Sequence, residues 1–334
     1  MHGIVIDKPD HARINPDFPH YAGRQLMVRK AGGESVFVSL IEPFAGESFI
    51  RGRRALPVEP AVPGLNGPVA VEVQVATRVH GAPAGERTDV LFADNSGQTC
   101  TVPAAGMTVQ GEFAAIQKTG GQIIRAVLVG GTRLAVDDFE IAPALGRYRA
   151  KIARIDYRTR ELTLDKIVPA SAFRGAFVEI GDERRWSNHE VAEVVERDGV
   201  SVLKIRKSLE LKRTRAEHLT PIGDDRTRVK VPIASFAENG LWVANGNYSR
   251  LWRMEGEFLA QEFTLLGRAT PDDFAGDKAD LVSLEIGPGQ EVVLAARVTL
   301  SRTSDGSCRV ETNVPVRVKL PGKGWQDYTL GSRK

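Results

Sequence analysis

The sequence, 334 residues long, predicts an all-β fold in which an antiparallel β-sandwich is followed by a smaller β-rich domain. Short apolar runs recur along the chain, separated by turns that contain glycine, asparagine or aspartate, as in successive hairpins. No long window shows the apolar period of an amphipathic helix. The composition, 42% hydrophobic and 26% charged, is that of a globular protein and excludes a disordered or fibrous chain. We therefore expect a sandwich or barrel built from hairpins.

The first expected element is a central hairpin in RQLMVRKAGGESVFVSLIEPF, residues 24–44. Two apolar runs, residues 26–28 and 36–41, flank Gly32 and Gly33, and glycines supply the positive φ that a tight turn needs. Apolar residues fall on both sides of each strand. This pattern favours a hairpin that is covered on both faces.

The next expected strand is VAVEVQVATRVH, residues 69–80, in which valines alternate with polar residues such as Glu72 and Gln74. A period of two is typical of a strand with one buried face and one polar face. The polar face is either solvated or a surface that binds sugars. Three further hairpins are expected at residues 88–102, 111–129 and 147–164.

A composition shift near residue 145 suggests a domain boundary. We expect a β-sandwich over residues 1–145, a small β domain over 146–222 and a C-terminal β region over 223–334, which can pack with the domain before it.

The sequence also predicts local structure in two segments of the later domains. Residues 182–198 fit either a helix or a loop that leads into a strand at 191–196, and the strongest turn signal is Asp198-Gly199. A Gly-Pro-Gly turn at 287–289 precedes a long strand expected at 291–300.

The charge pattern gives no sign of a nucleic-acid or membrane partner. The 45 basic and 42 acidic residues are interspersed and leave a net charge of only +3. No apolar stretch is long enough to cross a membrane as a helix, and the first residues do not form a secretory signal.

The two cysteines, Cys100 and Cys308, have neither a CxxC partner nor a histidine neighbour. This spacing excludes a structural zinc site and a dithiol redox motif, and no cofactor is expected. Either one long-range disulfide or two unpaired thiols fits the sequence.

One group of candidate catalytic residues lies near the start of the chain, where His11, His20 and Tyr21 stand among several prolines. Histidine and tyrosine are residue types that transfer protons, so this group is the candidate acid and base. The histidine spacing matches no metal-ligand motif, and no metal site is expected. The alternative is a polar, extended lead-in to the first strand.

A candidate carbohydrate-binding group lies in GLWVANGNYSRLWRMEG, with Trp242, Tyr248, Arg250 and Trp252. Aromatic rings stack on sugar faces, and arginine pairs with carboxylates. The Asn-Gly-Asn sequence predicts a tight turn between two strands, so Tyr248, Arg250 and Trp252 are expected to share one patch. The alternative is that both tryptophans belong to the core.

The segment HYAGRQLMVRKAGGESVFVSLIEPFAGESFI resembles the C-terminal β-sandwich region of heparinase II/III-type polysaccharide lyases. In that family a strand that ends in two basic residues, here Arg29-Lys30, leads through a short turn to a strand similar to FVSLIEPF. The resemblance is best over residues 20–56 and weaker toward the C-terminus.

The resemblance implies a part of a polysaccharide-degrading system, usually exported, that cleaves acidic polysaccharides by β-elimination. The family's catalytic residues lie mostly in an α/α toroid, for which this chain has no helices. We therefore expect a non-catalytic scaffold or carbohydrate contact surface, with an acidic polysaccharide as ligand and a toroid-bearing chain as partner. The alternative is a lyase or hydrolase, either in its own right or with a partner chain that supplies the toroid. A periplasmic or extracellular location follows from the resemblance, although the chain shows no signal peptide.

Overall fold

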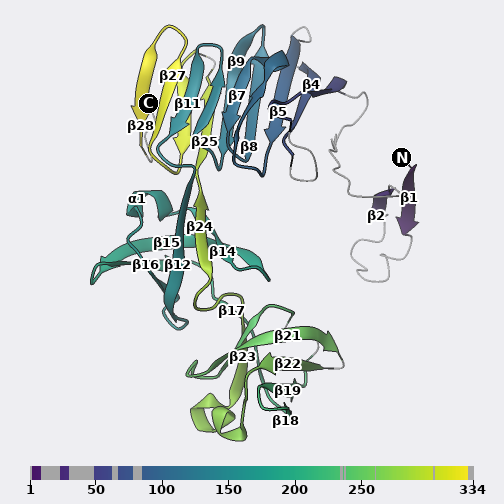
Figure 1. Cartoon of the computed structure of the whole chain (residues 1–334), viewed down its shortest axis with the longest axis vertical. Coiled ribbons are helices and arrows are strands. Elements are labelled where there is room, and N and C mark those ends of the chain that lie inside the picture. The colour runs from purple at the N-terminus through teal and green to yellow at the C-terminus, as the bar shows by residue number, and fades with distance from the viewer. Residues whose placement is uncertain are drawn as a thin grey trace.

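The all-β expectation is confirmed by a computed structural model of the chain, which describes residues 2–8, 23–29, 49–61, 67–77, 85–233, 236, 238–259, 261–303 and 305–329. Antiparallel strands dominate these residues, and the α-helix among them, α1 (Ala170–Phe173), is a single turn. Three bodies follow one another down the long axis of the molecule: a β-sandwich, a closed barrel and a seven-stranded sheet (Figure 1).

The sandwich consists of a seven-stranded and a six-stranded sheet. In order across the first sheet, its strands are β26 (Cys308–Thr312), β25 (Arg297–Arg302), β9 (Gln122–Val129), β8 (Phe113–Thr119), β5 (Gly85–Ala93), β4 (Val69–Thr77) and β3 (Ile50–Leu56). The second sheet contains β28 (Gly324–Tyr328), β27 (Val316–Leu320), β11 (Phe139–Pro143), β10 (Arg133–Val136), β7 (Met107–Gln110) and β6 (Thr99–Val102), with the short helix η2 (Pro103–Ala105) before β7. Apolar side chains from both sheets form one core between them.

Two of the three later hairpins are confirmed, and one is wrong. β8 pairs with β9, and the barrel strands β12 and β13 pair across their expected turn. The segment 88–102 is not a hairpin, because β5 pairs with β4 and β8 in one sheet whereas β6 pairs with β7 in the other. Phe92 and Cys100 thus enter the same core from opposite sheets. The alternating pattern predicts a strand but not the sheet to which the strand belongs.

The strand β4 differs from the expectation of one buried and one polar face. Val73 and Val75 are buried, as expected, but Glu72 on the opposite face is buried as well. The Arg54 Nε and Nη2 atoms donate to both Glu72 carboxylate oxygens, at 2.9 and 3.0 Å. This bidentate ion pair balances the negative charge of the buried Glu72 carboxylate.

The closed barrel is the middle body. Around it run β12 (Arg147–Asp156), β13 (Glu161–Leu164), β16 (Val200–Ile205), β15 (Trp186–Arg197), β14 (Phe177–Gly181) and β24 (Glu291–Ala295). β-Bulges in β12 and β15 let each of these long strands bend and pair on both sides of the barrel. Most of segment 182–198 is therefore strand rather than helix, and Asp198 and Gly199 form its turn with φ of 52° and 75°.

The third body, named here the inserted sheet, contains β17 (Glu210–Arg215), β23 (Asp280–Leu284), β20 (Trp242–Asn245), β21 (Leu251–Leu259), β22 (Glu262–Leu266), β19 (Arg226–Lys230) and β18 (His218–Ile222). Two short helices, η3 (Pro271–Phe274) and η4 (Gly276–Lys278), precede β23. β23 is buried on both faces: Val282 and Leu284 join the barrel core, while Leu281 packs with Val243 and Trp252 in a separate core. The barrel and the inserted sheet therefore share apolar packing.

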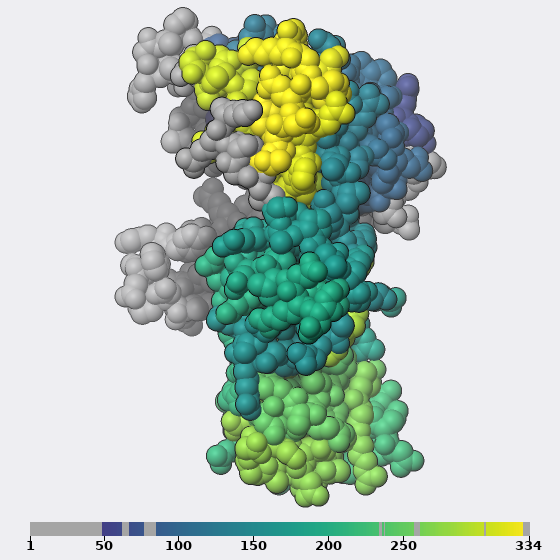
Figure 2. All heavy atoms as spheres, turned by 90° about the vertical axis from the view of Figure 1, so that its left-hand side faces the viewer, coloured from purple at the N-terminus to yellow at the C-terminus, as the bar shows by residue number. Residues whose placement is uncertain are grey.

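The three bodies are nested in the sequence. Ala296 N donates to Gly146 O at 2.8 Å, so the chain leaves and re-enters the sandwich at neighbouring residues. Glu285 N likewise donates to Leu209 O at 3.3 Å, where the inserted sheet branches from the barrel. Blue and yellow segments, far apart in the sequence, consequently lie together in the sandwich (Figures 1 and 2).

Because the bodies are nested, one expected domain limit lies between two of them and another lies inside a single sheet. The expected boundary at residue 145 lies where the chain passes from β11 to β12. The expected limit at 222 instead lies between β18 and β19, which pair within one sheet. Ala296 divides the strand expected at 291–300 into β24 of the barrel and β25 of the sandwich.

The first strand of the expected hairpin at 24–44 lies within β2 (Gly23–Arg29), which pairs with β1 (His2–Lys8). The turn and the second strand of that hairpin lie outside the described residues.

Candidate functional site

An open cleft of about 530 Å³ lies between the barrel and the inserted sheet. On the barrel side its residues come from the end of β12 and the turn after it, and on the other side from the β20–β21 turn and η4. The cleft is lined by Ala153, Arg154, Ile155, Asp156, Tyr157, Arg158, Asn247, Tyr248, Leu251, Asp277 and Pro288. Its volume is within the range of about 300–1,000 Å³ that is usual for small-molecule sites.

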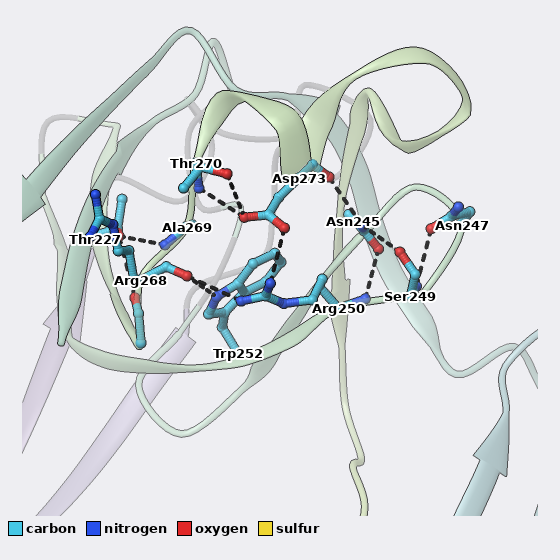
Figure 3. Close-up of polar contacts among 11 residues, drawn as sticks. Thr227, Asn245, Asn247, Ser249, Arg250, Trp252, Arg268, Ala269, Thr270 and Asp273 are labelled. Atoms are coloured by element: carbon cyan, nitrogen blue, oxygen red, sulfur yellow. Dashed lines mark hydrogen bonds and ion pairs between the residues drawn. The ribbon is translucent and has the colours of Figure 1, made fainter. Parts of the chain in front are cut away.

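The β20–β21 turn is held in one conformation by Asn245, which is fully buried. The Asn245 side-chain amide donates to Ser249 Oγ at 2.9 Å and to Asp273 O at 3.0 Å, and its oxygen accepts from Arg250 N at 3.1 Å. Figure 3 shows this network closing the turn on the side of η3. The residues at the tip of the turn, Asn247 and Tyr248, are thereby fixed before any ligand binds.

Tyr248 joins the two sides of the cleft. Its φ of 64° is in the left-handed region, and its ring stacks on that of Tyr157 with centroids 5.2 Å apart. Arg213 Nη2 donates to Tyr248 Oη at 2.9 Å. Tyr157 Oη donates to Ile286 O at 3.1 Å, and burial raises the pKa of Tyr157. Both tyrosines are therefore packed, hydrogen-bonded rings.

The remaining polar groups of the cleft come from both bodies. Asn247 Nδ2 donates to Asp277 Oδ2 at 3.1 Å. The Thr159 and Arg158 backbone N–H groups donate to Asp156 and lower its pKa, so this carboxylate stays ionised. Within the described chain, the exposed Arg154 and Arg158 guanidinium groups make no ion-pair contact, although Arg154 acts on Asp156 at longer range. Two cations thus remain available to a ligand.

The relative position of the two bodies is fixed by a largely buried ion pair beside Trp242. Arg253 Nη2 donates to both carboxylate oxygens of Asp182, at 2.8 and 2.7 Å, and only 10% of the Arg253 side chain is exposed. Gln290 also donates to Asp182 at 3.1 Å. Because Asp182 follows β14 and Arg253 lies in β21, the pair joins the barrel to the inserted sheet.

The four residues predicted to bind sugars do not form one patch. Tyr248 packs against the barrel core, whereas Trp252 is 3% exposed and belongs to the separate core of the inserted sheet. The Trp252 indole stacks on Phe274 and donates to Arg268 O at 3.3 Å. Arg250 lies over the indole and pairs with Asp273 (Figure 3). The turn therefore separates Tyr248 from the Arg250–Trp252 pair.

Trp242 lies on the face of β20 opposite to Val243, which is the cross-strand partner of Trp252. The Arg253 guanidinium lies 4.8 Å from the centre of the Trp242 ring, and a Cβ at Gly287 would come within 2.2 Å of the indole. Only glycine fits at position 287, because the backbone there packs directly on the ring. Trp242 thus packs where the barrel meets the inserted sheet.

A serine–histidine–carboxylate group is formed by two residues of β15 and by Glu285, which follows β23. His189 Nε2 lies 2.8 Å from Ser187 Oγ and 3.8 Å from Glu285 Oε2. Both contacts use the same ring nitrogen, whereas a nucleophilic triad needs the serine and the acid on different nitrogens. Ser187 and His189 are also buried, so this group is part of the packed interior. The predicted acid–base residues, His11, His20 and Tyr21, lie outside the described residues.

Sequence reasoning missed Arg154, Tyr157, Arg158 and Asp277 as site residues. The segment ARIDYRTRELTLD gave only a hairpin signal, and nothing local indicates that its turn meets residue 248. Across the described ranges, no group of three or more histidine, cysteine or acidic side chains is arranged to hold a metal ion. No helix in the described part of the chain is long and apolar enough to cross a membrane.

Comparison of the chain with family models, with curated proteins and with solved structures gives no match.

Proposed function

We propose that the protein is a non-catalytic carbohydrate-binding β-protein of a polysaccharide-degrading system, and that it holds a short acidic oligosaccharide in the cleft between the barrel and the inserted sheet. The observation on which this proposal depends is the fixed turn that presents Asn247 and Tyr248 opposite Arg154 and Arg158. The resemblance of residues 20–56 to polysaccharide lyases supports the same class of ligand.

The chemistry of the cleft fits a sugar acid. The guanidinium groups of Arg154 and Arg158 offer charge-assisted hydrogen bonds to carboxylates, and Asn247 offers an amide to hydroxyl groups. The half-buried ring of Tyr248, stacked on Tyr157, supplies an apolar surface beside these polar groups. Because the cleft is open and its arginines are exposed, we expect affinities between high micromolar and millimolar.

Binding is favoured over elimination because Tyr157 and Asp156, which line the cleft, are poor bases near neutral pH. The raised pKa of Tyr157 keeps its hydroxyl protonated, and that hydroxyl already donates to a backbone carbonyl. The lowered pKa of Asp156 makes it a weak proton acceptor. A partner chain would supply the cleavage chemistry.

The proposal is tested by calorimetric titration with oligosaccharides from heparin, hyaluronan and alginate. We expect at least one of them to bind, and Arg154→Ala and Arg158→Ala each to weaken binding by about twofold to fivefold, the effect of losing one exposed charge pair. Arg174→Ala is the matched control, because Arg174 is an exposed arginine of the same barrel outside the cleft. Added salt is expected to weaken binding through screening.

Two outcomes contradict the proposal. One is the absence of binding to all three ligands, and the other is an equal loss in the Arg174→Ala control. Ultraviolet detection of unsaturated products from the isolated chain would instead identify a lyase.

A further inference from the structure

A second cavity, of about 320 Å³, opens at one end of the sandwich between its two sheets. It lies among the β8–β9, β10–β11, β25–β26 and β27–β28 connections and the strand ends beside them. Its lining includes Ile123, Val136, Phe139, Leu300, Cys308 and Leu320. The cavity belongs to a different body from the cleft proposed to bind carbohydrate.

The walls of this cavity are continuous with the sandwich core. Val136, Phe139 and Leu300 are at most 2% exposed and belong to that core, and Leu320 is 7% exposed. Such walls offer apolar contact and few hydrogen bonds, so they favour an apolar ligand. The volume is about twice that of an engineered apolar cavity of about 150 Å³ that binds benzene, which leaves room for an alkyl chain of medium length.

The mouth of the cavity carries charges of both signs. Asp138 pairs with Lys319, and Asp137 lies 3.8 Å from Lys118. Arg302, by contrast, pairs with no carboxylate among the described residues and donates only to the Gln122 side-chain oxygen, at 3.2 Å. An unneutralised cation beside apolar walls complements an alkyl chain that ends in an anion.

We infer that this cavity is a binding site for a medium-chain carboxylate, with the alkyl chain between the two sheets and the carboxylate at Arg302. Cys308 provides a direct reporter of occupancy, because it lines the cavity and is the cross-strand partner of Arg302. The other thiol of the chain, Cys100, is fully buried in the same core and provides the internal control.

The test measures the rate at which an aromatic disulfide reagent labels Cys308 in the full chain, with and without decanoate below its micelle-forming concentration. We expect decanoate to slow labelling of Cys308 at least about fivefold at saturation, since an occupied cavity excludes the reagent. Cys100 is expected to stay unlabelled until the protein unfolds. Calorimetric titration gives the affinity independently of the thiol.

Arg302→Gln removes the cation and is expected to weaken decanoate binding by about twofold to fivefold, the effect of one exposed charge pair. Arg309→Gln is the matched control. Arg309 is an exposed arginine of the same hairpin, and because side chains alternate along β26 it lies on the face opposite to Cys308. Decyltrimethylammonium, with the opposite charge on the same chain, is expected to bind more weakly than decanoate.

The inference is overturned if decanoate neither protects Cys308 nor gives a heat of binding. It is also overturned if Arg302→Gln and Arg309→Gln bind equally well, or if the cationic amphiphile protects Cys308 as well as decanoate does. Melting curves of both variants establish that each is folded, and the wild-type protection result does not depend on either variant.

Discussion

Asn245 is the residue on which the conformation of the candidate cleft depends, because it is fully buried and makes three hydrogen bonds. Asn245→Ala leaves Asp273 O and Arg250 N without these partners. We expect a loss of about 1–3 kcal/mol in the free energy of unfolding, the usual cost of an unsatisfied buried group. Denaturant unfolding measures it, and Ser249→Ala, which removes a single bond at an exposed residue, is the control. A loss no larger than that of the control would contradict the assigned role.

His189 predicts a pH dependence of stability. Burial lowers the pKa of His189, against the opposing effect of Glu285. Below the unfolded pKa of about 6.5, the unfolded chain gains a proton that the folded chain does not, so stability is retained above this pH and lost as pH falls toward the folded pKa. We expect the melting temperature to fall more between about pH 7.5 and 5 in the wild type than in His189→Gln. Equal falls in the two proteins would exclude His189 as the cause.

At the scale of the element, β23 connects the inserted sheet to the barrel, because its alternate residues enter two cores. Leu284→Ala is expected to cost about 2–5 kcal/mol of unfolding free energy, since it opens a cavity at a fully buried site. Leu211 in the neighbouring strand β17 is 45% exposed, so Leu211→Ala is expected to change stability by no more than about 0.5 kcal/mol. Chemical denaturation of the two variants measures the difference, and similar values would mean that β23 is not packed as described.

At the scale of the whole molecule, the nested order predicts which parts fold alone. Among the described residues, the side chains of the sandwich core come from residues 56–141 and 298–328, and Gly146 is hydrogen-bonded to Ala296. Replacing residues 147–295 with a short Gly-Ser linker is therefore expected to leave a folded sandwich. A cooperative thermal transition and a β-type circular dichroism spectrum would identify it.

Removing only the inserted sheet, residues 210–284, is expected to have the opposite effect. The barrel core then loses Ala244, Val282 and Leu284. A Gly-Ser linker between Leu209 and Glu285 would span a gap about as short as the one between Gly146 and Ala296. We expect the barrel transition to move to lower temperature or to disappear. A barrel that melts unchanged would show that the shared apolar packing is dispensable.

The sequence by itself determined the all-β class, the β8–β9 and β12–β13 hairpins, and the turns at Asp198-Gly199 and Asn245-Gly246-Asn247. These features are local, because alternation of side chains and positive φ are properties of neighbouring residues. Only the tertiary structure decided that β5 and β6 belong to different sheets, that the three bodies are nested, and that Tyr248 meets Tyr157 while Trp252 enters another core. A strand can pair on either edge and bury either face, and contacts between segments far apart in the chain settle that choice.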